Sequence, residues 1–269
     1  MLLANSLFSS IPVDPMNQSA PRPIALVTGS SRAIGIGAAI ATTLAQSGWD
    51  VAITYWRAYD AEMPWGSTPV EVETLCAQMQ AHGAHTLAIE ADLSLIETPD
   101  HLFATVQQEL GPITALIMAH AYSVDSDILT TTVASFDHHF AINARATWLL
   151  VREFGRNFQG VFGRGRIIAI TSDHTAHNLP YGASKGALDR IVLAAANEFR
   201  SLRLTANVIN PGATDTGWMS AEQLAQVKEQ VLLGRVGLSQ DCANLVQFLC
   251  SPEGGWINGQ LLYSDGGLQ

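Results

Sequence analysis

Charged residues are scarce in this sequence. Asp, Glu, Lys and Arg make up only 14% of the 269 residues, whereas hydrophobic residues make up 48%. Such a composition predicts a well-buried core and argues against a disordered chain. Basic residues are the scarcer of the two signs, because 14 Lys and Arg face 24 Asp and Glu, for a net charge of −10. This balance argues against nucleic acid or an anionic membrane as a partner.

Cysteines and long apolar runs are also few. The three cysteines, Cys76, Cys242 and Cys250, are odd in number and have no paired spacing. We therefore expect reduced thiols in a cytoplasmic protein. No apolar run reaches the length that spans a bilayer. The start of the chain lacks the basic region of a signal peptide, and it predicts a flexible leader over 1–22, ahead of one domain over 23–269.

Short apolar runs alternate with longer helical patterns along the rest of the chain. The runs do not alternate strictly between apolar and polar residues, which predicts strands covered on both faces. Repeated strand–helix units form a parallel sheet with right-handed crossovers. We predict a single doubly wound α/β domain of the Rossmann type, with about seven strands. The expected strands lie near 24–28, 50–55, 85–92, 113–121, 166–171, 204–210 and 260–264.

A glycine-rich turn, "VTGSSRAIGIGAAIA", separates the first strand from the first helix. Glycine permits positive φ and a close approach of the backbone to a ligand. The N-terminus of a helix offers free N–H groups to a pyrophosphate. The position of the turn between strand and helix favours a dinucleotide site. The alternative is a tight turn that only packs the helix against the strand.

The end of the second strand bears on which dinucleotide would bind. In an NAD site an acidic residue there holds the ribose 2′-hydroxyl, but Tyr55 and Trp56 stand at that place. Arg32 in the turn and Arg57 could each pair with a 2′-phosphate. The sequence therefore favours NADP(H) over NAD(H), unless both arginines are ordinary solvated side chains.

A tyrosine and a lysine follow the fifth strand in the segment "TSDHTAHNLPYGASK". Tyr181 and Lys185 are four residues apart, so a helix places them on one face, at the carboxyl ends of the strands. A nearby ammonium, together with the positive ring of an oxidised nicotinamide, favours the phenolate and lowers the pKa of a tyrosine toward the range useful for proton transfer. Taken alone, such a pair is more often two neighbours on a surface helix. The preceding strand and Ser172 favour the catalytic interpretation.

Together these ordered features resemble the short-chain dehydrogenase/reductase family, from about residue 23 to residue 267. Besides the turn and the pair, the resemblance rests on Asp92 after the third strand and on Asn143 in "AINARATWLL". It also rests on the segments "NPGATDTG" and "WINGQLLYSDGG". Within the family the chain is most similar to reductases of the 3-oxoacyl-carrier-protein reductase type.

The resemblance implies an enzyme that interconverts a carbonyl and a secondary alcohol by hydride transfer with a nicotinamide cofactor. Tyr181 would be the general acid/base, Ser172 would hydrogen-bond the substrate oxygen, and Lys185 would also bind the nicotinamide ribose. Asn143 would hold a water that links the lysine to solvent. The cofactor-binding residues expected on the same basis are Thr28, Gly29, Ser31, Arg32, Gly35, Ile36, Gly37, Tyr55, Arg57, Asp92, Leu93, Ala119, Tyr181, Lys185, Pro211, Gly212, Thr214 and Thr216.

The glycine-rich turn is the first of three departures from the family pattern. Two extra residues, Ala33 and Ile34, lengthen it. We expect Gly29, Gly35 and Gly37 to face the pyrophosphate.

The other departures lie beyond the fourth and fifth strands. The segment "MAHA", residues 118–121, stands where the family has Asn-Asn-Ala-Gly. We expect the loss of side-chain hydrogen bonds that brace the central sheet, which leaves cofactor contact there to the backbone. Tyr181 follows Ser172 by nine positions, fewer than is usual in the family, which predicts a wider mouth of the substrate cleft.

Several other residues near these motifs invite an interpretation. Asp173, His174 and His177 could supply two metal ligands, but a competent site needs three or more, so we expect polar cleft-wall residues and no metal. Trp218 and Met219 are expected in a substrate lid.

A homo-oligomer, a tetramer or a dimer, is expected from the helix that carries the pair. Its small residues Gly182, Ala183, Gly186 and Ala187 permit close approach of another helix, and in the family this helix often packs at a subunit interface. The other expected partner is a small-molecule carbonyl or alcohol substrate.

Two other functions fit parts of the sequence. A non-catalytic dinucleotide-binding sensor or scaffold would account for the altered turn and "MAHA". It would not need Asn143, Ser172, Tyr181 and Lys185 together. An enoyl reductase would account for the longer turn, but those enzymes space their tyrosine and lysine more widely than the three intervening residues found here.

Overall fold

A parallel sheet forms the centre of the protein. The computed structural model describes residues 21–161 and 163–268, so the expected leader over 1–22 lies outside the described residues except for Pro21 and Arg22. Seven strands of the described chain pair in the order β3-β2-β1-β4-β5-β6-β9, which confirms the predicted doubly wound sheet. The strands are β1 (Ile24–Thr28), β2 (Asp50–Tyr55), β3 (Thr86–Glu90), β4 (Ile113–Met118), β5 (Arg166–Ile170), β6 (Thr205–Asn210) and β9 (Leu261–Tyr263).

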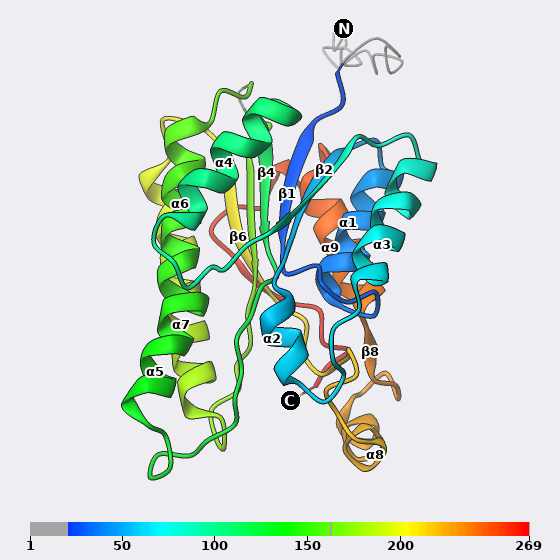
Figure 1. Cartoon of the computed structure of the whole chain (residues 1–269), viewed down its shortest axis with the longest axis vertical. Coiled ribbons are helices and arrows are strands. Elements are labelled where there is room, and N and C mark those ends of the chain that lie inside the picture. Colours follow the sequence, from blue (N-terminus) through cyan, green and yellow to red (C-terminus); the bar gives the residue numbers. More distant parts are fainter. Residues whose placement is uncertain (1–20, 162, 269) are drawn as a thin grey trace, which may run out of the picture.

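Helices cover both faces of the sheet (Figure 1). Those on one face are α1 (Ile36–Gln46), α3 (Pro69–Ala81) and α9 (Ser239–Cys250). Those on the other are α4 (Thr98–Glu109), α6 (Ala146–Asn157) and α7 (Leu179–Glu198). Neighbouring residues of β1 show why the strands are apolar throughout: Leu26 enters one hydrophobic core and Val27 the other, because successive strand residues point to opposite faces.

The shorter elements lie outside these layers or extend them. The helices α5 (Val133–His139) and α6 are joined by a π-helical segment, η1 (Phe140–Arg145), so residues 133–157 form one nearly continuous helical rod. The remaining elements are α2 (Arg57–Glu62), β7 (Thr214–Asp215), α8 (Ala221–Gln230), β8 (Gly237–Leu238) and η2 (Glu253–Trp256).

The strand order reverses between β1 and β4, the two central neighbours. From β1 the chain passes to β2 and β3 on one side, and from β4 it passes to β5, β6 and β9 on the other. Connections therefore diverge at the carboxyl ends of β1 and β4 and leave a crevice, where this type of sheet binds ligands. In the described part of the chain, no helix is long and apolar enough to cross a membrane.

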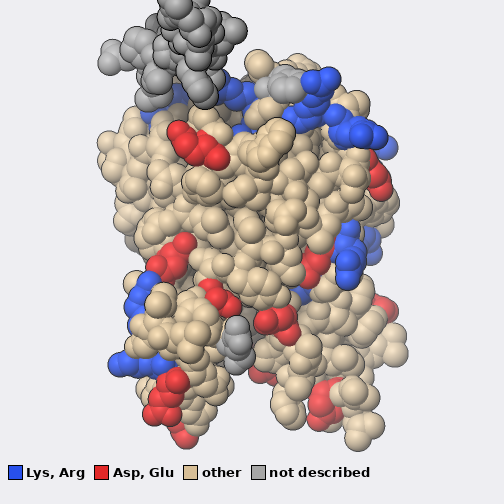
Figure 2. Space-filling model, turned by 180° about the vertical axis from the view of Figure 1, so that it is seen from behind, with Lys and Arg blue, Asp and Glu red and all other residues tan. Residues whose placement is uncertain are grey.

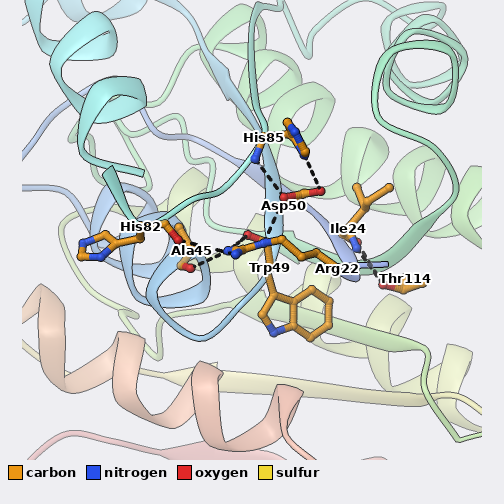
Figure 3. A network of polar contacts seen from close by, with 8 residues as sticks. All are labelled: Arg22, Ile24, Ala45, Trp49, Asp50, His82, His85 and Thr114. Carbon is orange, nitrogen blue, oxygen red and sulfur yellow. Dashed lines mark hydrogen bonds and ion pairs between the residues drawn. The ribbon is translucent and has the colours of Figure 1, made fainter. Parts of the chain in front are cut away.

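Arg22 ties the start of the described chain to the amino ends of the strands (Figure 3). Its Nε lies 3.1 Å from Oδ1 of Asp50. Its Nη2 donates to the carbonyl oxygens of Ala45 at 2.8 Å and Trp49 at 2.9 Å. The Asp50 carboxylate also accepts from the backbone N–H of His85. A cation at the C-terminus of α1 opposes the negative end of the helix dipole, so Arg22 belongs to the folded domain.

We expect Arg22→Ala to lower the free energy of unfolding by about 1–3 kcal/mol, because several hydrogen bonds to a charged group are lost. Chemical denaturation would measure the change. Arg200→Ala, at an exposed position in the turn that follows α7, is the matched control. Equal stability of the two variants would contradict the anchoring role.

Candidate active site

The turn after β1 is shaped by close backbone contacts. Gly29 has φ +77°, and a Cβ there would lie 2.5 Å from the Cα of His120. A Cβ on Gly37 would lie 2.3 Å from the carbonyl oxygen of Gly29. Only glycine fits either position. Gly35 is less constrained, since its φ is −72° and its nearest neighbour, the carbonyl oxygen of Arg32, would lie at 3.1 Å.

The N-terminus of α1 is suited to an anionic group. The described residues supply no side-chain cap at Gly35, so the first N–H groups of the helix are available to a ligand. The Ser30 hydroxyl beside it is buried and has no hydrogen-bond partner among the described residues. A buried polar atom without a partner and an uncapped helix end are features that a bound pyrophosphate would satisfy.

A cleft with a volume of about 290 Å³ opens beside this turn. Five sequence-predicted residues line it: Gly29, Ser31, Tyr55, Asp92 and Leu93. The prediction missed the other lining residues, which are Thr54, Trp56, Ala58, Tyr59, Glu62, Ala91, His120, Ala121, Tyr122, His138 and Ile142.

Much of what was missed comes from α2, in the insertion after β2. The Tyr59 hydroxyl lies 3.3 Å from the carbonyl oxygen and 3.4 Å from the backbone nitrogen of Ser123. Its ring centroid is 5.3 Å from that of Tyr122. Burial raises the pKa of Tyr59, so the hydroxyl stays protonated. These contacts join α2 to the segment beyond β4, a partner that the sequence around residues 57–62 does not indicate.

His120 supplies the bracing hydrogen bonds that "MAHA" was expected to lose, so that expectation is wrong. Its Nε2 lies 3.1 Å from the carbonyl oxygen of Ile142. A carbonyl can only accept, so Nε2 carries the proton and Nδ1 accepts from the Thr28 hydroxyl at 2.7 Å. The neutral ring thus joins β1, the end of β4 and η1. Burial and the charge of Lys185 lower the pKa of His120 to about 3.

Asn143 lies in the π-helical segment, a kind of irregularity that often marks functional sites. It is fully buried. Its Nδ2 donates to the carbonyl oxygen of Tyr122 and to Oγ of Ser184, both at 2.9 Å. Its Oδ1 accepts from the backbone N–H of Tyr122 at 2.8 Å. Both amide protons are therefore used in holding the segment after β4 against α7. The water-holding role of Asn143 stays a prediction. Because both amide protons are used, a water would have to donate its hydrogen bond to an oxygen of Asn143.

Tyr181, Lys185 and Ser172 lie together at the carboxyl end of β5. The Ser172 side chain lies near enough to the Tyr181 hydroxyl to lower the pKa of the phenol, and its Oγ accepts from the backbone N–H of His174 at 3.2 Å. Thr171 turns to α7, and its hydroxyl lies 3.5 Å from the carbonyl oxygen of Lys185. Lys185 is 2% exposed. Its Nζ lies 5.7 Å from the Tyr181 ring centroid and donates to the carbonyl oxygen of Ile170 at 2.9 Å.

Burial dominates the titration of this pair. It raises the pKa of Tyr181 to about 12, and the nearby Ser172 side chain offsets only part of that rise. Burial lowers the pKa of Lys185 to about 8, against the opposing effect of Asp189. In the chain by itself, burial determines the direction of the shift, and the ammonium of Lys185 is directed at the carbonyl oxygens of Ile170 and His120. The lowering expected with an oxidised nicotinamide in place stays a prediction.

The short loop before Tyr181 packs directly onto α7. A Cβ on Gly182 would lie 1.9 Å from the carbonyl oxygen of His174, so this glycine is required by its own loop. Asp173, His174 and His177 are exposed. Among the residues that the structure describes, no three His, Cys, Asp or Glu side chains form a group able to hold a metal.

The two arginines expected at a 2′-phosphate differ. Arg57 pairs with Glu90 at the end of β3. Within the described chain, Arg32 has no carboxylate at ion-pair distance, and it stacks on the ring of Trp65 at 4.2 Å.

The remaining predicted cofactor residues lie around the cleft without lining it. In the loop after β6, Gly212 has φ +60° and its N–H donates to Asn210 Oδ1 at 2.9 Å. The Thr214 hydroxyl donates to the carbonyl oxygen of Pro211 at 3.2 Å. Outside the cleft lining stand Thr28, Arg32, Gly35, Ile36, Gly37, Arg57, Ala119, Tyr181, Lys185, Pro211, Gly212, Thr214 and Thr216.

The fold and the site together define a dinucleotide-binding α/β enzyme of the doubly wound class. Comparison with known proteins narrows this class. Residues 29–269 match the family model described as enoyl-(acyl carrier protein) reductase. The uncharacterised oxidoreductase YjdA of Bacillus subtilis (strain 168) is 32% identical over 250 residues, 91% of this chain and 96% of the relative. NADPH-dependent aldehyde reductase 2, chloroplastic, of Arabidopsis thaliana is 32% identical over 265 residues, 91% and 93% of the two chains.

Solved structures agree with these relatives. A dehydrogenase/reductase from Sinorhizobium meliloti 1021 has a TM-score of 0.82 at 32% identity, over 93% of this chain and 96% of that one. A short-chain dehydrogenase from Burkholderia cenocepacia J2315 in complex with NADP has a TM-score of 0.81 at 31% identity, over 91% and 97%. The chain belongs to the short-chain dehydrogenase/reductase family, which confirms the resemblance of the motifs, and it is an NAD(P)-dependent oxidoreductase.

We expect His120 to make the fold acid-sensitive. Its pKa is about 3 when folded and about 6.5 when unfolded, so below about pH 6.5 protonation favours the unfolded chain. Between about pH 7 and about pH 5 the wild type should lose roughly 2 kcal/mol more unfolding free energy than His120→Asn. Urea unfolding at both pH values would measure this. An equal loss of unfolding free energy in the two proteins would contradict a lowered pKa of His120.

Proposed function

We propose that the protein is an NADP(H)-dependent oxidoreductase that interconverts a carbonyl and a secondary alcohol. The observation that carries the proposal is the proximity of the Ser172 side chain to the Tyr181 hydroxyl, through which it lowers the pKa of the phenol, beside the buried Lys185. Two hydroxyl groups that meet at the carboxyl end of β5 can both donate to one substrate oxygen, which is the arrangement that polarises a carbonyl.

The raised pKa of Tyr181 suits proton donation. With a pKa of about 12, the phenol is protonated at neutral pH, so it can deliver a proton to a carbonyl oxygen that gains negative charge. Ser172 holds both this hydroxyl and the substrate oxygen in place. The cofactor, when bound, would supply or accept the hydride. The protonated phenol therefore suits catalysis in the direction of carbonyl reduction at neutral pH.

Lys185 acts as a buried charge behind the tyrosine. With a pKa of about 8 it is mostly an ammonium at neutral pH. Its Nζ donates hydrogen bonds to the backbone carbonyl oxygens of Ile170 and His120. These hydrogen bonds compensate part of the cost of burying the charge. We infer that the same Nζ binds the nicotinamide ribose, and that Asn143 keeps the neighbouring segment in register.

Three features support NADP(H) over NAD(H). No acidic side chain ends β2, where Tyr55 stands. Arg32 is left without a carboxylate at ion-pair distance in the described part of the chain, whereas Arg57 is engaged by Glu90. A relative at 32% identity is named an NADPH-dependent aldehyde reductase, and a solved relative is in complex with NADP.

A homo-oligomer, a tetramer or a dimer, is the partner that we propose besides a small carbonyl or alcohol. The face turned away from the viewer in Figure 1 has a broad area without charged side chains (Figure 2). Around the edge strand β9, Phe248 is 41%, Trp256 98% and Tyr263 56% exposed. On α7, Gly186 has open space in place of a side chain. Such apolar surface is typical of subunit contacts.

The sensor alternative has lost part of its support. It rested on the altered turn and on the loss of bracing at residues 118–121, and His120 restores that bracing. The enoyl reductase alternative is supported only by the description of the matching family model, and the spacing of Tyr181 and Lys185 still counts against it. Neither alternative needs Ser172 beside Tyr181.

We expect Tyr181→Phe to lower kcat for carbonyl reduction by at least about a hundredfold, because general acid catalysis contributes that much. Consumption of NADPH with a panel of aldehydes and ketones would measure it. Tyr263→Phe, on the edge strand, is the control. Binding of NADPH to Tyr181→Phe should remain, so an inactive variant that binds NADPH supports the proton-donor role. An active one contradicts it.

The pH dependence of reduction should follow Lys185. Its pKa of about 8 means that it is charged below that value and neutral above it, whereas Tyr181 stays protonated. We therefore expect kcat/KM for reduction to be level near neutral pH and to fall above about pH 8. A profile that rises through this range would argue that an unprotonated group does the work.

A further inference from the structure

Three aromatic or cationic side chains from distant parts of the sequence meet beside the glycine-rich turn. Arg32 lies over the ring of Trp65 at 4.2 Å. The Trp65 ring centroid is 4.9 Å from that of Trp218. The first residue comes from the turn after β1, the second from the insertion after β2, and the third from the segment after β6. The proposed chemistry uses neither tryptophan.

Trp65 is the fixed member of this group, which we call the arginine–tryptophan stack. Its indole Nε1 donates to Oδ1 of Asp60 at 3.0 Å, and Asp60 is 5% exposed at the end of α2. The hydrogen bond holds the ring in one orientation. Arg32 contacts the backbone beyond it as well, because a Cβ on Gly217 would lie 2.9 Å from Arg32 Nη2.

Stacking prepares Arg32 to bind an anion. A guanidinium that stacks on an indole keeps its N–H donors at its edge. Those donors match a phosphate bidentately. In the described chain no carboxylate at ion-pair distance competes for them. Holding the side chain in place also removes rotamer entropy that would otherwise oppose binding.

The other end of the stack touches a weakly held segment. None of the residues of α8 is buried within the part of the chain that the structure describes, and in Figure 1 the helix lies below the sheet and its helical layers. Leu232 and Leu233 beyond it are 79% and 73% exposed. Segments with so little burial unfold locally at low cost in free energy. The Trp65–Trp218 contact can therefore influence whether the segment that contains Trp218 and α8 is ordered.

We propose that Trp65 is a specificity-determining residue: it holds Arg32 for the 2′-phosphate of NADP(H) and, through Trp218, links that phosphate to the ordering of residues 217–230. The proposal rests on the proposed use of NADP(H). Its consequence is that NADPH, and not NADH, orders the segment after β6.

Binding measurements test the first half. The affinities of NADPH, NADH and the fragment 2′,5′-ADP are measured by calorimetry for the wild type, Trp65→Phe and Trp65→Leu. Trp148→Phe is the matched control, since that side chain lies on α6 and is 49% exposed. We expect both Trp65 variants to bind NADPH and 2′,5′-ADP about tenfold more weakly and NADH unchanged. A structural role alone would weaken NADPH and NADH equally, and that result would overturn the proposal.

Limited proteolysis or hydrogen exchange of residues 217–230 tests the second half, without any turnover. We expect NADPH to protect this segment in the wild type and NADH to protect it much less. Trp218→Ala should lose the protection, and its NADPH affinity should fall only by the coupling between nucleotide binding and ordering of the segment. Equal protection by both nucleotides, or protection that survives in Trp218→Ala, would overturn the link.

The two proposals can fail separately. If the wild type binds NADPH and NADH equally, the cofactor preference fails and the role of Trp65 fails with it. If the wild type discriminates but Trp65→Phe and Trp65→Leu discriminate as well, only the role of Trp65 fails. A circular-dichroism spectrum that matches the wild type shows that a variant is folded, and Trp65→Phe preserves an aromatic face at the contact.

Discussion

The close contact between Gly29 and His120 is the constraint on which the site depends. It brings the turn after β1 against the end of β4, at the point where the strand order reverses. Because a Cβ on Gly29 would lie 2.5 Å from the His120 Cα, the two backbones are nearly in contact. The imidazole then ties Thr28 on one side to Ile142 on the other. The nucleotide cleft, the π-helical segment and the buried lysine are all positioned from this junction.

Much of the fold and part of the site could be predicted from the sequence. The apolar runs gave the sheet, since strands buried on both faces need them. The spacing of Tyr181 and Lys185 placed both on one helix face, and a polar residue after β5 had to lie near them because parallel strands end at one edge. These predictions rely on local spacing, which the backbone enforces.

The rest depended on contacts that local spacing does not encode. Thr28 and His120 are 92 positions apart, so the family pattern at residues 118–121 suggested a loss where the structure has a replacement. Lys185 is near Tyr181, as expected, but only the structure shows that its ammonium faces two carbonyl oxygens and that both side chains are buried. The sign of the phenol pKa shift followed from burial, which spacing does not reveal. The role of α2 in the cleft depended likewise on a partner beyond β4.

The contact between Gly182 and His174 bears on how this protein could have evolved. The carbonyl oxygen of His174 occupies the place of a side chain on Gly182, so the short loop and the glycine are compatible only with each other. A longer loop could move away and permit alanine or serine at residue 182, whereas a larger residue without such an insertion would push the loop off the helix that carries the tyrosine. The length of this loop and the residue at position 182 are therefore expected to change together among relatives. A loop can shorten in this way only after residue 182 has become glycine.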